Sequence, residues 1–264
     1  MYKIGLSTCG KQFNESLFNS YSLAGISSME ISIPKEECDS FDFKNALLLS
    51  ERYGVELWSF HLPFMPFSVI DISSAQLKDS TRQYLSEIVK KGADIGIQKF
   101  IVHPSGEPIS DEERLSRLEN SKESLYFLAD EAKKCGAVIC VEDLPRTCLG
   151  RNSDEINELT DVHPSLRVCL DTNHLLSETL PHFIVSVGSK IVTTHISDYD
   201  FVDEKHWMPG EGKIKWDEVV NALNEINYSG VWLYELGFKA PKTIKRSREL
   251  TCDDFVNNAN KYLK

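Results

Sequence analysis

The 264-residue sequence predicts a single (β/α)₈ TIM barrel, for three reasons. Short apolar or β-branched runs alternate with longer stretches of helical period, which indicates parallel strands joined by crossover helices. Eight such runs occur, and no linker, repeat or low-complexity tract divides them. Barrels of about 250 residues commonly form one domain, so we expect one barrel domain over residues 1–264.

The eight expected strands follow one another with room for a helix after each. The first is KIGLST (3–8), followed by a helical segment from about Asn14, and the second is MEISI (29–33), followed by the helix FKNALLLSERYG (43–54). The other six are VELWSFH (55–61), KFIVHP (99–104), AVICVED (137–143), LRVCLD (166–171), KIVTTHIS (190–197) and GVWLYEL (230–236). Gly54 and Gly136 stand where the end of a helix needs a left-handed backbone.

The composition is that of an ordinary globular protein, with 41% hydrophobic and 26% charged residues. No signal core follows the start, and nowhere do about 18 apolar residues run without charge, so we expect a cytoplasmic protein without membrane contact. Seven cysteines without C-x-x-C spacing favour reduced thiols over a disulfide framework. The net charge of −11 disfavours nucleic acid as a partner, while a homo-oligomer is left open.

Polar side chains stand where six of the expected strands stop. In a (β/α)₈ barrel these strand ends meet at one rim, which carries the chemistry. The six are His61, His103, Glu142, Asp171, His195 and Glu235. Unpaired carboxylates gathered in a closed cavity would cost several kcal/mol, and a divalent cation removes that cost. Within CLDTNHLL, the alternative is that Asp171 caps the next helix, but the recurring pattern favours metal binding, with His174 one helical turn away.

Five segments resemble the xylose isomerase-like TIM-barrel superfamily, which holds sugar isomerases and epimerases as well as the endonuclease IV DNA-repair enzymes. They are VEDLPR, CLDTNHLL, HISDYD, HWMPGEGKIKW and YELG, and the likeness spans nearly the whole chain. In the sugar 3-epimerases of this group, a Glu, an Asp, a His and a second Glu hold one divalent metal ion. The resemblance gives these roles to Glu142, Asp171, His195 and Glu235, and gives an acid–base role to the two glutamates.

The implied activity is that of a sugar, sugar-phosphate or polyol ketone isomerase or epimerase that uses one ion of manganese, zinc, magnesium or cobalt. One carboxylate would remove a proton beside a carbonyl, and a second would return it to the enediolate. We expect Glu142 and Glu235 to exchange this proton. The substrate-binding candidates are His61, His103, Arg146, His174, His206 and Trp207. A loop ion pair is the alternative role for Arg146.

Two other functions compete with this one. Endonuclease IV enzymes use the same four positions with further histidines and an acidic residue to hold three zinc ions. That pattern has candidates in His61, His103, His174, Glu204 and His206, although Glu204 stands where those enzymes have an aspartate. A barrel that only senses a sugar or a metal would not need both glutamates.

Two further groups of residues have a structural and a functional interpretation. The aromatic residues Trp58, Phe64, Trp207 and Phe238 could cover a sugar at the rim or pack in the barrel. Five basic residues crowd the segment FKAPKTIKRSREL (238–250), and we interpret this segment as solvated and not as a phosphate clamp. We also assign Glu211, in the loop HWMPGEGKIKW, a structural role.

Overall fold

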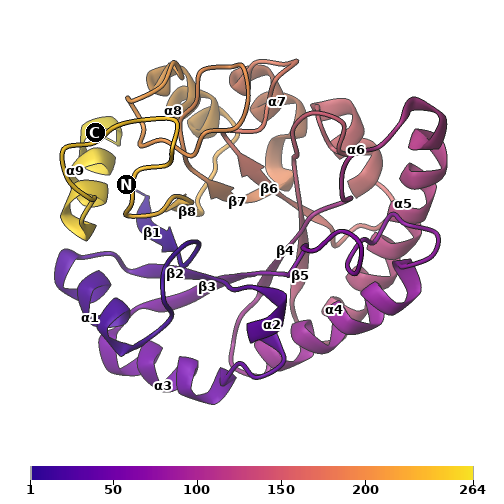
Figure 1. The fold of residues 1–264 in the computed structure, drawn as a ribbon, viewed down its shortest axis with the longest axis horizontal. Coiled ribbons are helices and arrows are strands. Elements are labelled where there is room, and N and C mark those ends of the chain that lie inside the picture. The colour runs from indigo at the N-terminus through magenta and orange to yellow at the C-terminus, as the bar shows by residue number, and fades with distance from the viewer. Residues whose placement is uncertain (1, 264) are drawn as a thin grey trace.

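Eight parallel strands surrounded by helices make up the computed structural model, which describes residues 2–263 (Figure 1). The strands are β1 (Lys3–Ser7), β2 (Ser28–Ser32), β3 (Glu56–His61), β4 (Lys99–Val102), β5 (Val138–Glu142), β6 (Arg167–Asp171), β7 (Ile191–His195) and β8 (Val231–Tyr234). Their order in the sheet is β7-β6-β5-β4-β3-β2-β1-β8. The predicted (β/α)₈ barrel is therefore confirmed.

The barrel closes between β7 and β8 through a short seam. The backbone N–H of Ile196 donates to the carbonyl of Leu233 at 2.8 Å, and the N–H of Glu235 donates to the carbonyl of Ile196 at 3.3 Å. The hydroxyl of Thr194 adds a bond to the carbonyl of Val231 at 3.0 Å. This seam is an isolated bridge, in contrast to the longer ladders between the other neighbouring strands.

Helices cover the outside of the barrel. They are α1 (Glu15–Ala24), α2 (Lys35–Cys38), α3 (Phe43–Tyr53), α4 (Lys78–Ala93), α5 (Asp111–Lys134), α6 (Ser153–Thr160), α7 (Leu180–Val187), the 3₁₀ turn η1 (Gly188–Lys190), α8 (Trp216–Glu225) and α9 (Cys252–Tyr262). The side chain of Asn14 caps α1 by accepting from the N–H of Leu17 at 3.0 Å, so the predicted helix start is confirmed. Gly54 ends α3 with a left-handed backbone, as expected.

The side chains inside the barrel lie in successive layers, because residues two apart on a strand share one face. A lower layer includes the apolar cluster of Ile101, Cys140 and Cys169. Two residues further along these three strands, at the C-terminal rim, stand His103, Glu142 and Asp171. The large hydrophobic core lies outside the strands, between them and the helices. Strand register thus places the polar residues together at one end of the barrel.

Candidate active site and metal centre

Four side chains from successive strands meet at the C-terminal rim. Glu142, Asp171 and His195 end β5, β6 and β7, and Glu235 directly follows β8. Each offers one ligand atom, and these atoms lie within 4.8 Å of one another. His195 Nδ1 lies 3.1 Å from an oxygen of Glu142, 3.3 Å from one of Glu235 and 3.9 Å from one of Asp171. The structure therefore brings together the four residues that the sequence grouped.

This donor set suits a divalent cation. All four side chains are buried, and Oδ2 of Asp171 has no hydrogen-bond partner. Three carboxylates around one imidazole nitrogen carry negative charge that no Lys or Arg offsets among the ion pairs of the described residues. Imidazole nitrogen and carboxylate oxygen are ligands for zinc, manganese and related ions. An ion held by these residues would remove the cost of burying them.

Asp171 does not cap a helix, so that alternative interpretation is wrong. The next helix, α7, begins at Leu180, and Thr179 caps it. Oδ1 of Asp171 accepts from the N–H of Asn173 at 2.7 Å, which is a local turn. The segment from Asp171 to His174 is therefore a turn and not part of a helix. Nε2 of His174 nevertheless lies 3.6 Å from Oδ2 of Asp171.

Further histidines surround the four residues. His61 and His103 approach Oε2 of Glu142 at 3.1 and 3.2 Å, so these three side chains form a second group with metal-ligand geometry. His174, Glu204 and His206 form another such group at the edge of the cavity. All five residues that the sequence offers for the wider three-zinc pattern thus line the same cavity.

The two glutamates differ in pKa. Burial raises the pKa of Glu235 to about 7, and the nearby charge of Glu142 adds to this. Burial also acts to raise the pKa of Glu142, but the charges of His195 and His103 and their hydrogen bonds hold it well below its usual range. Two carboxylates whose environments push their pKa values apart are suited to acid and base roles.

A cavity of about 830 Å³ opens above these residues. His61, His103, Glu142, His174 and Glu235 line its floor. An apolar wall, defined here as the cavity-lining residues of the loops after β2 and β3, stands on one side and consists of Ile33, Pro34, Leu62, Pro63, Phe64, Met65, Pro66 and Phe67. The ring of Phe64 stacks on His103 with their centroids 3.9 Å apart. An apolar wall with a few convergent polar groups is typical of small-ligand sites.

Arg146 lines the cavity but is held by carboxylates. Its guanidinium pairs with Glu107, Asp203 and Glu204, and these contacts are the loop ion pair considered from the sequence. His206 also lines the cavity, and its Nδ1 lies 3.1 Å from the carbonyl oxygen of Glu235. Trp207 is not among the lining residues, and its Nε1 donates to the hydroxyl of Thr243 at 2.9 Å.

Two secondary expectations need correction, those for Arg246 and Trp58. Arg246 is not solvated, because its side chain is 7% exposed and pairs with Glu211. Phe238 packs against Phe255 and does not line the cavity, in agreement with the packing interpretation. Trp58 lies at the opposite end of the barrel, where its Nε1 donates to Thr193 at 3.0 Å. Of the four aromatic residues proposed for the rim, only Phe64 lines the cavity.

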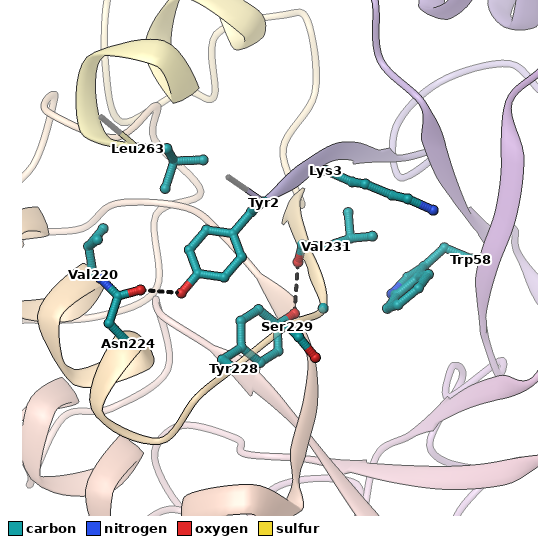
Figure 2. Close-up of a pocket in the computed structure, with 10 residues that line it drawn as sticks. Tyr2, Lys3, Trp58, Val220, Asn224, Tyr228, Ser229, Val231 and Leu263 are labelled. Atoms are coloured by element: carbon teal, nitrogen blue, oxygen red, sulfur yellow. Dashed lines mark hydrogen bonds between the residues drawn. The ribbon is translucent and has the colours of Figure 1, made fainter.

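A second hollow, of about 460 Å³, opens beside the N-terminal ends of β1 and β8 (Figure 2). Both of its tyrosine hydroxyls are already bonded within the protein, since Tyr2 donates to Asn224 at 2.8 Å and Tyr228 donates to the carbonyl of Val231 at 2.8 Å. Within residues 2–263, none of the His–carboxylate groups lies among its lining residues. The candidate site is therefore the cavity at the C-terminal rim.

Two buried carboxylates beside the site, Glu30 and Asp143, were not expected from the sequence. Glu30 lies in the middle of β2, 0% exposed, and contacts His195. A charged residue between Met29 and Ile31, inside an otherwise apolar run, was the signal that could have identified it. Asp143, directly after β5, is also buried, and burial raises its pKa well above the usual range.

Residues 22–252 match the sequence profile described as xylose isomerase-like TIM barrel. An uncharacterised protein of Methanocaldococcus jannaschii is 28% identical over 203 residues, which are 72% of this chain and 67% of that protein. D-psicose 3-epimerase of Ruminiclostridium cellulolyticum is 30% identical over 118 residues, which are 42% of this chain and 39% of that enzyme.

Solved structures resemble the whole chain. A D-tagatose 3-epimerase-like protein superposes with a TM-score of 0.82 at 21% identity, over 99% of this chain and 97% of that protein. At this identity the match shows the fold.

Proposed function

Because the chain belongs to the xylose isomerase-like TIM-barrel family, we propose that it is a sugar isomerase or epimerase that depends on a divalent metal ion. Glu142, Asp171, His195 and Glu235 would hold the ion. The observation that carries the proposal is the convergence of these four residues beside a cavity with an apolar wall, which Glu142 and Glu235 line. The likeness to D-psicose 3-epimerase supports a sugar as the substrate.

The chemistry proposed for the site is proton transfer at the carbon beside a carbonyl. A divalent ion, when bound, would polarise neighbouring hydroxyl and carbonyl oxygens and so acidify the C–H between them. Glu142 and Glu235 come from β5 and β8, which β6 and β7 separate, so their carboxylates approach a ligand from different directions. One carboxylate would take the proton and the other would return it. Return to the opposite face of the same carbon inverts the configuration there, and return to the neighbouring carbon gives isomerisation.

The test is solvent deuterium incorporation in full-length protein supplied with Mn²⁺ and a panel of ketoses. We expect deuterium at the carbon beside the carbonyl, and we expect Glu142→Gln and Glu235→Gln to lower turnover by about 10²–10⁴-fold. Metal content is measured in each variant, because both residues are also ligands. Glu36→Gln is the matched control, since Glu36 lines the same cavity and is exposed.

The two variants need not behave alike. If one glutamate is the base for a given substrate, its Gln variant should lose exchange, while the other still exchanges without turning over. Turnover without any deuterium would point to hydride transfer between carbons. The two-glutamate mechanism would then be withdrawn, although the metal centre would stand.

A second candidate function is a phosphodiesterase that acts on DNA with clustered zinc ions. One observation favours it: the additional groups His61–His103–Glu142 and His174–Glu204–His206 also have metal-ligand geometry. The number of metal ions per chain separates the two functions. One ion supports the sugar enzyme, whereas three zinc ions together with cleavage of DNA would support the phosphodiesterase.

A further inference from the structure

Glu30 and the three other carboxylates contact opposite nitrogens of the His195 ring. Both oxygens of Glu30 lie 3.0 Å from Nε2, whereas Nδ1 faces Glu142, Glu235 and Asp171. The hydroxyl of Ser59, from β3, also donates to Oε2 of Glu30 at 2.8 Å. One imidazole thus joins Glu30 on β2 to the candidate metal ligands on the far strands.

Packing does not explain a carboxylate at this position. Glu30 is fully buried, and its neighbours Met29 and Ile31 belong to the hydrophobic core. A buried carboxylate is costly unless it is paired, and an apolar side chain of similar volume is often as stable or more so. The partners of Glu30 are one serine hydroxyl and His195. The contact with the imidazole ring of His195 is therefore what explains a carboxylate at this position.

We propose that Glu30 is a positioning residue, which holds His195 as the tautomer with its proton on Nε2. This inference rests on the metal centre proposed above. A neutral imidazole has one N–H, and when that group donates to Glu30, the lone pair of Nδ1 is directed at the space between Glu142 and Glu235. Metal-binding histidines commonly donate their other N–H to a carboxylate in this way. The opposite tautomer would place a proton where the ion must bind.

The experiment compares wild type with Glu30→Gln, both at full length, by calorimetric titration with Zn²⁺. The amide of Gln can donate to Nε2 and so favour the wrong tautomer, and we expect zinc affinity to fall about 10- to 100-fold. Ser59→Ala is the matched control, because it removes the other hydrogen bond of Glu30 but leaves the contact with His195, and it should change affinity less than about threefold. Circular dichroism without metal shows whether each variant folds.

The second measurement needs no variant. In a long-range ¹H–¹⁵N spectrum of zinc-loaded wild type, the proton of the His195 ring should be on Nε2. A proton on Nδ1, or unchanged zinc affinity in folded Glu30→Gln, would overturn the role of Glu30. If wild type binds no zinc, the proposed metal centre itself is wrong. The zinc titration of wild type is therefore done before any variant is made.

Discussion

Asp171 shows how a single side chain can indicate the kind of ligand that a site binds. Its Oδ1 is used by the turn that follows β6, while its Oδ2 is buried without a hydrogen-bond partner. Buried polar atoms are rarely left unpaired, because the loss of hydration costs about 1–3 kcal/mol or more for a charged group. An unpaired carboxylate oxygen beside His174 and His195 is therefore best explained by a cation that completes the site.

Replacing Asp171 by Asn should abolish stabilisation by metal. An ion present at about 100 times its Kd stabilises a folded protein by about 2.7 kcal/mol, so added Mn²⁺ should raise the Tm of wild type. The amide keeps the shape and the bond to Asn173 but removes the charged ligand, and the Tm of the variant should not respond. Differential scanning calorimetry with and without Mn²⁺ measures both effects.

Asp143→Asn is the matched control for this prediction. Asp143 is buried nearby and accepts from the N–H of Asp171 at 2.7 Å, which an amide oxygen can also do. Burial raises the pKa of Asp143 well above the usual range, and Asn keeps the shape and the accepting oxygen of this side chain. Its Tm should keep the full response to Mn²⁺. An equal loss of response in both variants would count against Asp171 as a ligand.

Among the connecting elements, the loop between β7 and α8 is held by an ion pair with the segment after β8. Glu211 accepts two bonds from the guanidinium of Arg246 and one from the N–H of Met208. Burial acts to raise the pKa of Glu211, but these bonds hold it below its usual value. A carboxylate with a lowered pKa stabilises the fold above its unfolded pKa of about 4.3, and this contribution is lost as pH falls through the folded value.

Arg246→Ala should lower the free energy of unfolding at pH 7 by about 1.5–3 kcal/mol, because it leaves a half-buried carboxylate without its charged donor. Urea titrations at pH 7 and at pH 3 measure this loss, which should shrink at the lower pH. Lys242→Ala, an exposed neighbour in the same segment, should change the free energy by less than about 0.5 kcal/mol. Equal stability of the two variants at pH 7 would show that the ion pair does not hold the loop.

The strands were predictable from sequence because each is a short apolar run bounded by turn residues. The prediction for β4 extended to Pro104, but the strand ends at Val102, and proline lacks the N–H that the ladder would need. Trp58 was misplaced for a different reason. The pairing of β2 with β3 skips Trp58, since Met29 faces Leu57 and Glu30 faces Ser59. This irregularity affects which face of the sheet Trp58 occupies. Its distance from the rim follows from its place in β3, three residues before His61, which is about 10 Å along the strand.

The candidate ligands were predictable because strand ends converge in any parallel barrel, whatever the loops do. The apolar wall was not, since it depends on loop conformations that local sequence does not determine. The burial of Arg246 was not predictable for the same reason. Its partner Glu211 is 35 residues away in the chain, and only the fold brings the two side chains together. Composition alone makes such a segment look solvated.

At the scale of the whole barrel, two of the four candidate metal ligands lie at the seam between β7 and β8, where the barrel closes. His195 ends β7 and Glu235 follows β8, so an ion bound by both would link the two edge strands. The backbone bonds across this seam involve Ile196, Leu233 and Glu235. The same ion would also contact β5 and β6 through Glu142 and Asp171.

Metal should therefore slow amide hydrogen exchange at the seam more than elsewhere. We expect the amides of Ile196 and Glu235 to gain up to about 100-fold protection when Mg²⁺ or Zn²⁺ is present at 100 times its Kd. Amides of the β1–β2 ladder, whose strands carry none of the four candidate ligands, serve as the internal control and should gain less. Exchange measured by mass spectrometry on peptides from both regions gives the comparison, and equal gains would mean that the ion does not bridge the seam.

All four candidate ligands come from β5 to β8, whereas the apolar wall comes from the loops after β2 and β3. The candidate ion-binding residues thus lie in the second half of the chain, and most of the apolar lining of the cavity lies in the first. Substitutions in residues 33–67 can change which molecule fits without touching any ligand atom. A barrel arranged in this way can acquire a new substrate while it keeps its reaction.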